Sequence, residues 1–184
     1  MSDGWLGISY KVPTEPSRKR VYVWRKLKDI GAVYLQQGVG LLPHSEDLLR
    51  ELEQLRKEVF DMGGEAAVLS LSFLNAEDEQ RLINDCRASR NQEYDEIIDK
   101  CGLLIEELEH ETAVSKFTFA EIEENEEELH KINRWLKKVI ARDYFAAPGR
   151  SAALEVIGRA TDRANQYAEE VYHREIPRGP GNQS

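Results

Sequence analysis

The element order of the first part of this chain is decided by one stretch, which reads Ala32-Val33-Tyr34-Leu35-Gln36-Gln37-Gly38-Val39-Gly40-Leu41-Leu42-Pro43. Branched and aromatic residues on both sides of Gln37-Gly38 predict two short strands, Ala32–Gln36 and Val39–Leu42, joined as a hairpin. Pro43 closes the second strand. A helical pattern precedes the hairpin and another follows it, so the hairpin predicts a domain that combines a sheet with helices.

Upstream of the hairpin, Trp5–Val12 has the composition of a strand and is stopped by Pro13. Pro16 and Ser17 suit the start of a helix, and Gly31 suits its end. A turn of about 100° per residue places five apolar residues on one arc of this helix. We expect these residues to be buried: Val21, Val23, Trp24, Leu27 and Ile30.

Downstream of the hairpin, His44 or Ser45 can cap a second helix, which Gly63-Gly64 ends. The segment Glu65–Leu74 alternates leucine and phenylalanine with serine, as a half-buried strand does. The resulting order β-α-β-β-α-β is the ferredoxin-like plan. The fold class is therefore predicted as α+β, with a ferredoxin-like domain over residues 1–74.

The remainder predicts a helical domain over residues 75–176, made of three long antiparallel helices. Asn75 can cap the first, whose pattern weakens at Arg87–Gln92, so we expect a kink or break there. The capping box Thr118–Glu121 begins the second helix, which should run to about Phe145. A third helix begins near Arg150 or Ser151. The Gly/Pro-rich residues 177–184 predict a disordered tail.

The charge of the chain is strongly polarised. The net charge is −9, but up to Pro43 seven basic residues face three acidic ones, so the remainder carries −13. Helical spacing places Arg18, Lys19, Arg25 and Lys26 opposite the apolar arc. These four could contact the phosphate backbone of a nucleic acid. The alternative is a solvated face, or one paired with the acidic helices of the same chain or of a dimer.

Several short motifs together resemble the N-terminal domain of the ChrB chromate-resistance regulator family. They are Trp5, Val12-Pro13, Glu15–Arg18, Val23–Leu27, Gly31-Ala32, Tyr34–Gly38, Leu41–Pro43, Gly63–Ala66, Phe117–Glu121 and Arg142–Arg150. The likeness covers about residues 5 to 173. A more distant likeness links the first 70 residues to the ferredoxin-like modules of the repressor PaaX and of small CRISPR-associated nucleases, and it concerns the fold alone.

The family resemblance implies a bacterial cytoplasmic protein that acts in the regulation of chromate or other oxyanion resistance. Longer family members continue into a C-terminal chromate-resistance domain, and this chain stops where that domain would begin. A separate protein carrying that domain is therefore an expected partner.

Two arginines with an adjacent acid suggest an oxyanion site. Arg142 and Arg150 could bind an oxyanion through their forked donors, and Asp143 could orient one of them. The start of a helix at Arg150 also offers free backbone N–H groups. The alternative is a salt bridge at a helix end, with neighbouring aromatic side chains closing the core.

The residues give no support to an enzyme, a metal or a cofactor. A nuclease of the CRISPR-associated type needs a carboxylate at the end of the first strand, where this chain has Tyr10-Lys11-Val12. The four histidines have no ligand spacing. Cys86 and Cys101 read as buried apolar residues rather than as a disulfide or an oxidant sensor, although a lowered pKa would allow sensing. No apolar window is long enough for a membrane span, and the cytoplasm is the expected location.

The sequence thus predicts a non-enzymatic regulatory or accessory protein of chromate or oxyanion resistance, contacting DNA through its basic first helix. The alternative is a protein-interaction module whose helical region docks the partner that carries the output. A homodimer is expected, because strands at the edge of such a sheet often pair.

Overall fold

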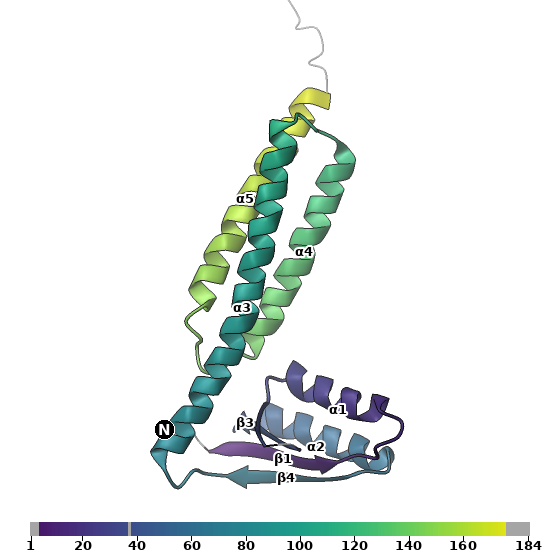
Figure 1. The fold of residues 1–184 in the computed structure, drawn as a ribbon, viewed down its shortest axis with the longest axis vertical. Helices are drawn as coiled ribbons and strands as arrows, with labels where there is room; N and C mark the ends of the chain where they lie inside the picture. Colours follow the sequence, from purple (N-terminus) through teal and green to yellow (C-terminus); the bar gives the residue numbers. More distant parts are fainter. Residues whose placement is uncertain (1–3, 37, 176–184) are drawn as a thin grey trace, which may run out of the picture. The chain divides into compact units, whose positions relative to one another are not determined.

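The computed structural model describes residues 4–36 and 38–175. Within them lie four strands and five helices in an α+β arrangement (Figure 1). The strands are β1 (Trp5–Lys11), β2 (Val33–Gln36), β3 (Val39–Pro43) and β4 (Glu65–Leu71), and the helices are α1 (Arg18–Asp29), α2 (Glu46–Asp61), α3 (Ala76–Ala113), α4 (Phe119–Ala141) and α5 (Arg150–Glu175). None of these helices is both long enough and apolar enough to cross a membrane.

The four strands form one antiparallel sheet in the order β2-β3-β1-β4. The central strand β1 pairs Ile8 with Gly40 of β3 on one side and with Val68 of β4 on the other. The predicted hairpin is confirmed in its two strands, β2 and β3, while Gln37 in its turn lies outside the described residues. The strand β4 ends at Leu71, three residues earlier than predicted.

Alternation along β1 divides its side chains between the two faces of the sheet, each of which has its own core. Leu6 and Ile8 face α1 and α2, where they pack with Leu27 and Leu52. Trp5 lies on the opposite face and belongs to a second cluster at the start of α3. The sheet is therefore buried on both faces near Trp5.

Local sequence signals position the two helices that cover the sheet. Ser45 caps α2, because its hydroxyl accepts a hydrogen bond from the backbone N–H of Leu48 at 3.2 Å. Gly31 ends α1 with a φ of +80°, and Gly63 ends α2 with a φ of +77°. Both glycines occupy the left-handed conformation that side chains disfavour.

By its packing the chain divides into two units. The sheet-bearing unit contains residues 1–89 together with 142–146, and the helical unit contains residues 90–141 and 147–184. Packing thus groups the start of α3 and the five residues after α4 with the sheet. The boundaries expected from sequence, 1–74 and 75–176, stay a prediction about domains. The proposed tail, 177–184, lies outside the described residues.

The break predicted at Arg87–Gln92 is wrong, since α3 is one continuous helix of 38 residues. The polar residues of this segment make tertiary contacts instead of interrupting the helix. In the sheet-bearing unit, Arg87 Nε donates to the carbonyl oxygen of Phe145 at 2.9 Å. In the helical unit, Asn91 Oδ1 accepts from the backbone N–H of Gly149 at 2.9 Å. These contacts explain why the sequence of this segment lacks apolar periodicity although its backbone stays helical.

In the helical unit, α4, α5 and the part of α3 that follows Ser89 run side by side (Figure 1). Their buried side chains form one continuous core. Tyr167 is 1% exposed, stacks on Phe117 with ring centroids 5.6 Å apart, and donates its hydroxyl to the carbonyl of Lys116 at 2.6 Å. The Thr118 half of the predicted capping box is confirmed at the start of α4, where Thr118 Oγ1 accepts from the backbone N–H of Glu121 at 3.3 Å. The helix α4 ends at Ala141, before the predicted Phe145.

One buried carboxylate in the helical unit should make stability depend on pH. Glu111 is 4% exposed, and its Oε1 lies 3.3 Å from Lys116 Nζ, which also pairs with Glu121. Burial, and next the nearby carboxylate of Glu121, raises the pKa of Glu111 above its ordinary value. Because an acid with a higher pKa in the folded state binds its proton more tightly there, its ionisation destabilises the fold above that pKa.

We therefore expect Glu111→Gln to raise the free energy of unfolding at about pH 8, since the amide resembles the protonated acid. The gain should shrink as pH falls through the raised pKa and level off below the ordinary value of 4.5, because the wild-type side chain is then protonated in both states. The lost ion pair costs little, because the Lys116 side chain is 52% exposed. Urea unfolding at several pH values measures the effect, with exposed Glu123→Gln as the control. A gain that does not vary with pH would contradict this assignment.

Candidate nucleic-acid interface

The inner face of α1 is narrower than the apolar arc predicted from sequence. Val23 and Leu27 are fully buried against the sheet and α2, as expected. Val21 and Trp24, however, are 42% and 47% exposed, so the prediction that they belong to the core is wrong. A helix that lies on a sheet beside a second helix buries only a narrow stripe of its own surface. Side chains outside that stripe, such as those of Val21 and Trp24, stay in contact with solvent.

The outer face of α1 combines basic and apolar side chains. At 100° per residue, five exposed residues fall within about one third of the helix circumference. This set, called the open face below, is Arg18, Val21, Trp24, Arg25 and Lys28. The ammonium group of Lys28 lies 5.2 Å from the centroid of the Trp24 ring, a cation–π arrangement. Among the described residues, Arg18, Arg25 and Lys28 make no ion pair.

Two of the four predicted phosphate contacts lie on a different side of α1, toward α2. Lys19 Nζ donates to the carbonyl oxygen of Met62 at 2.7 Å, and its side chain is partly buried. Lys26 lines a small cleft with Glu51 and Glu58 of α2, and Tyr22 donates to Glu58 at 2.9 Å. This side of the helix therefore lies against α2, where Lys19 binds a carbonyl oxygen and Lys26 lies near two acids of its own unit; their contact with phosphate stays a prediction.

The structure thus distributes the four predicted residues around α1. Arg25 is exposed on the open face, Lys19 and Lys26 lie toward α2, and the exposed Arg18 lies at the edge between the two, where it also lines a pocket with Glu58 and Asp61 of α2. Lys28, which the sequence interpretation left out of the basic face, is exposed on the open face with Arg25. The spacing of Arg18, Arg25 and Lys28 could have predicted this, because residues i, i+7 and i+10 lie on one side of a helix.

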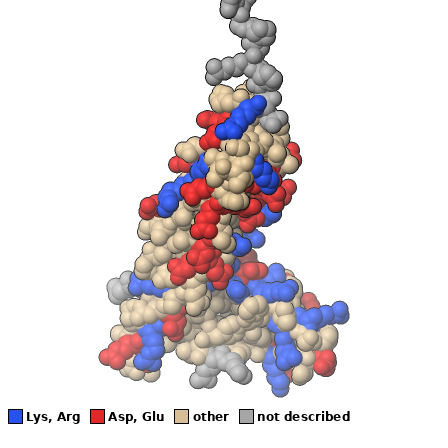
Figure 2. Space-filling model, turned by 45° about the horizontal axis from the view of Figure 1, so that its top comes forward, with Lys and Arg blue, Asp and Glu red and all other residues tan. Residues whose placement is uncertain are grey.

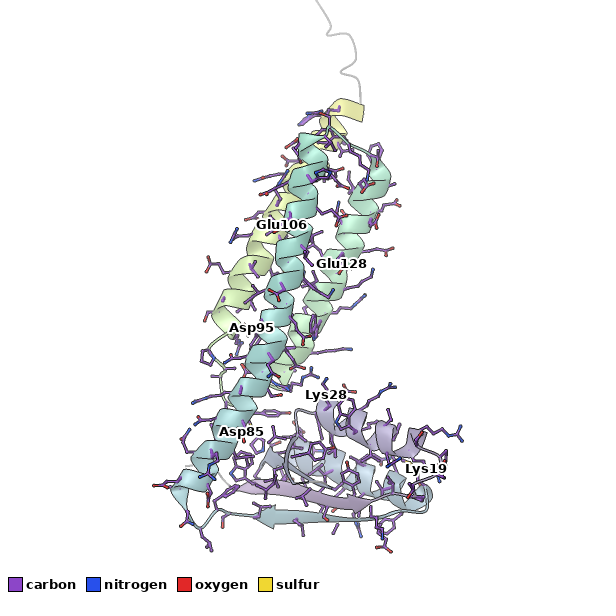
Figure 3. All side chains as sticks on the ribbon, viewed as in Figure 1. Lys19, Lys28, Asp85, Asp95, Glu106 and Glu128 are labelled. Atoms are coloured by element: carbon purple, nitrogen blue, oxygen red, sulfur yellow. The ribbon has the colours of Figure 1, made fainter. Side chains whose placement is uncertain are left out.

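Figure 2 shows one face of the molecule coloured by charge. On this face several Lys and Arg side chains gather on one side of the sheet-bearing unit, while Asp and Glu side chains, interspersed with Lys and Arg, follow the helical unit. In Figure 3 the labelled Lys19 and Lys28 lie toward the two ends of α1, and the labelled acids lie on α3 and α4. The helix α1 has no acidic residue in its first turn. Acidic residues of the same helix therefore neutralise the positive charge of the open face only weakly.

The predicted oxyanion ligands are divided between the two units. Arg142 and Asp143 belong to the sheet-bearing unit, and Arg150 lies at the start of α5 in the helical unit. The Arg142 side chain is 9% exposed, and its Nη1 lies 4.0 Å from Asp29 Oδ1 at the end of α1. An oxyanion site made by Arg142, Asp143 and Arg150 stays a prediction.

The segment Arg142–Ala146, called the link below, is attached to the sheet-bearing unit by aromatic side chains. Tyr144 donates its hydroxyl to the carbonyl oxygen of Ile30, just beyond the end of α1, at 2.8 Å. Phe145 stacks on Trp5 with ring centroids 5.5 Å apart. The link therefore satisfies a carbonyl at the C-terminus of α1 and covers the second core of the sheet, roles that the sequence interpretation did not assign to these residues.

The thiols are consistent with the apolar interpretation. Cys86 and Cys101 are both buried and form no disulfide. Burial raises the pKa of Cys101 to about 11, which opposes the thiolate that an oxidant sensor needs. Within residues 4–36 and 38–175, no three His, Cys, Asp or Glu side chains are grouped so that they could hold a metal ion.

Comparison with known proteins places these features in a family. The family model described as "Protein ChrB, N-terminal" matches residues 20–177 of the chain. A similar curated protein is Protein ChrB of Cupriavidus metallidurans, which is 32% identical over 92 residues. The matched part is 50% of this chain and 28% of that relative, so the chain corresponds to a minor part of the relative's length.

Proposed function

The chain belongs to the family of the N-terminal part of protein ChrB, and from that premise we propose that it is a regulatory or accessory protein of chromate or related oxyanion resistance. In this proposal it is not an enzyme, acts in the cytoplasm, and contacts DNA through the open face of α1. We also propose that the sheet-bearing unit has the ferredoxin-like fold. The β-α-β-β-α-β order and the strand order β2-β3-β1-β4 support this assignment.

The observation that supports DNA contact is the open face itself. Three cations, Arg18, Arg25 and Lys28, lie along one side of a helix about 18 Å long in a chain whose net charge is −9. An acidic protein is repelled by the phosphate backbone unless a local basic surface overcomes the repulsion. Forked arginine donors bind phosphate oxygens, and each neutralised phosphate releases counterions to the solvent.

The proposal is tested by salt-dependent binding to a labelled DNA duplex. We expect Arg18→Ala combined with Arg25→Ala to weaken binding at low salt, whatever the sequence of the duplex. The slope of log K against log salt should fall in magnitude by about 2, since each phosphate contact contributes about 0.9. Fluorescence anisotropy between about 50 and 200 mM salt measures both quantities.

The matched control is Lys137→Ala combined with Lys138→Ala, two exposed cations on α4 whose removal changes the net charge by the same amount. These substitutions should leave the slope unchanged. If the wild-type chain does not bind at low salt, or if the two pairs of substitutions have equal effects, contact through the open face is wrong.

A protein-interaction module is the second candidate, and the exposed apolar side chains Val21 and Trp24 favour it. The partner would be a separate protein that carries the C-terminal chromate-resistance domain. Binding of that protein, together with DNA affinity that is unaffected by the α1 substitutions, would favour this candidate over the first.

A further inference from the structure

The two edge strands of the sheet differ in how well they are protected against pairing with another chain. The strand β2 has four residues, and its register with β3 shifts between Tyr34 and Gln36. The strand β4 has seven residues, contains no proline, and pairs with β1 without a shift. A short, irregular edge strand resists further pairing, whereas a long, regular one is a template for it. Among the described residues only β1 pairs with β4, so the outer edge of β4 is open (Figure 1).

The side chains of β4 suit pairing with a copy of the same strand. The one charged residue, Glu65, stands at the first position of the strand. Val68 packs into the core beneath the two helices that cover the sheet. On the opposite face Ala67 is exposed and Leu69 is 43% exposed. A further strand at this edge would therefore cover an exposed leucine without burying a charge in the middle of the strand.

The helix α2 has one side that faces past the free edge of β4. Leu27 of α1 lies over Gly40 of β3, while α2 lies over β1 and β4. Because α1 contacts α2 at Glu58, the opposite side of α2 faces away from α1 and beyond β4. At about 100° per residue, four residues share this opposite side. This set, called the side stripe below, is Leu49, Glu53, Arg56 and Phe60.

The side stripe is complementary to a copy of itself. Phe60 is 48% exposed, and the guanidinium of Arg56 lies 5.4 Å from the centroid of its ring. Arg56 Nη1 also lies 3.2 Å from Glu53 Oε2. If two copies of α2 meet antiparallel about a twofold axis level with residues 54 and 55, Glu53 faces Arg56 of the second molecule. The same axis places Leu49 opposite Phe60 of the second molecule, so charges and apolar groups match together.

Pairing of β4 with a second β4 would bring the two side stripes to packing distance. Neighbouring strands lie about 4.8 Å apart. Since α2 lies over β1 and β4, a second copy of α2 would lie two strand spacings away, at about 10 Å. Packed helices have axes about 8–10 Å apart. One twofold axis can therefore pair the strands and pack the helices at the same time.

The connection between α2 and β4 indicates the register of this pairing. The N–H of Gly64 donates to the carbonyl oxygen of Val59 at 2.9 Å, so β4 begins level with the last turn of α2. The centre of the side stripe lies about 10 Å before the end of α2, at about 1.5 Å per residue. The same distance along β4 takes about three residues and reaches Ala67. The axis then passes two small side chains, and Leu69 faces Glu65 of the second molecule.

We propose that the chain forms a twofold dimer through β4, with the two sheets joined into one and the two copies of α2 packed antiparallel across the axis. The contact uses the same surface on both molecules, as a twofold dimer requires. It gives partners to the backbone N–H and C=O groups at the free edge and covers both Leu69 and Phe60. No residue of the open face of α1 takes part, so the dimer does not depend on DNA contact.

The oligomeric state, measured by analytical ultracentrifugation without DNA at about 150 mM salt, tests the proposal. We expect the wild-type chain to be a dimer. Ala67→Lys should weaken the dimer about tenfold or more, because the axis places the two like charges directly opposite each other. The control is Leu35→Lys, which puts the same charge on the β2 edge at a residue that is 53% exposed, and it should leave the dimer intact. Circular dichroism checks that both variants fold.

Exchange of charges in the side stripe provides the decisive measurement. Glu53→Arg gives each stripe two cations, and Arg56→Glu gives each stripe two acids, so either variant alone should form a weaker dimer. In an equimolar mixture an arginine faces a glutamate at both contacts, and the mixed dimer should form. A chain with both substitutions restores the same pairs between identical molecules and should also be dimeric. Recovery in these two cases excludes misfolding as the cause of the single-variant losses.

A monomeric wild-type chain, equal effects of Ala67→Lys and Leu35→Lys, or a mixture that stays monomeric would each overturn the proposal. The dimer and the DNA contact can also fail separately, because the substitutions on β4 and α2 leave α1 unchanged. If the wild-type chain is monomeric and binds DNA, only the dimer is wrong. If it is dimeric and does not bind DNA, only the DNA contact is wrong.

Discussion

Replacing Trp5 with alanine should lower the free energy of unfolding of the sheet-bearing unit by about 4 kcal/mol, the usual cost of truncating a buried tryptophan. Trp5 is 1% exposed and packs edge-on against Phe73 with ring centroids 5.9 Å apart, in addition to its stack on Phe145. Its indole Nε1 donates to Glu79 Oε1 at 2.9 Å. The substitution therefore removes the side chain that joins β1 to both α3 and the link.

The control for this prediction is Trp5→Phe, which keeps an aromatic ring but loses the hydrogen bond to Glu79. We expect it to cost about 1–2 kcal/mol. Urea unfolding followed by far-UV circular dichroism measures both variants, with the transitions of the two units fitted separately. A loss below about 1 kcal/mol for Trp5→Ala would mean that Trp5 is not the centre of this second core.

The second large effect is expected at Gly31, where alanine should cost about 3 kcal/mol. The φ of +80° alone disfavours a side chain by about 1–2 kcal/mol. In addition, an added Cβ would lie 2.9 Å from the Cβ of Arg142 and 3.2 Å from the ring of Tyr144. Overpacking of this kind costs a further 1–3 kcal/mol or so and would push the link away from α1.

Gly63 provides a matched control in the same unit. Its φ of +77° is nearly the same, but an added Cβ there would meet no atom within 4 Å. Gly63→Ala should therefore cost only the backbone contribution, about 1 kcal/mol. The difference between the free energies of unfolding of the two variants, measured in urea, gives the cost of placing a side chain where the link approaches α1. Equal losses at the two glycines would show that this approach contributes nothing.

Most elements of the fold could be predicted from the sequence because they are set by local signals. The hairpin strands, the Ser45 cap and the Thr118 cap all follow from a few adjacent residues. The same reasoning predicted a break in α3, because polar residues interrupt its apolar periodicity. Arg87 and Asn91 instead make hydrogen bonds to Phe145 and Gly149, which are distant in the sequence. A local sequence pattern cannot distinguish polar residues that make such contacts from polar residues that end a helix.

The candidate interface was predictable only in part. The basic character of α1 is evident from composition, and Arg18, Arg25 and Lys26 are exposed as predicted, whereas Lys19 is partly buried. The assignment of Trp24 to the core was wrong, since helical periodicity gives the direction of an apolar arc but not its width. Which side of α1 meets α2 depends on how the two helices pack, so the separation of Lys19 and Lys26 from Arg25 required the structure.

The link has a consequence for the order in which the chain can fold during synthesis. The sheet-bearing unit is discontinuous in sequence, because residues 90–141 lie between its main part and the link. A ribosome that has released residues 1–89 has not yet made Phe145, so Trp5 lacks its stacking partner at that stage. The N-terminal unit can therefore be completed only after all of α4 has been synthesised. A truncated chain that ends within α4 should expose Trp5 and be more prone to aggregation and proteolysis than the whole chain.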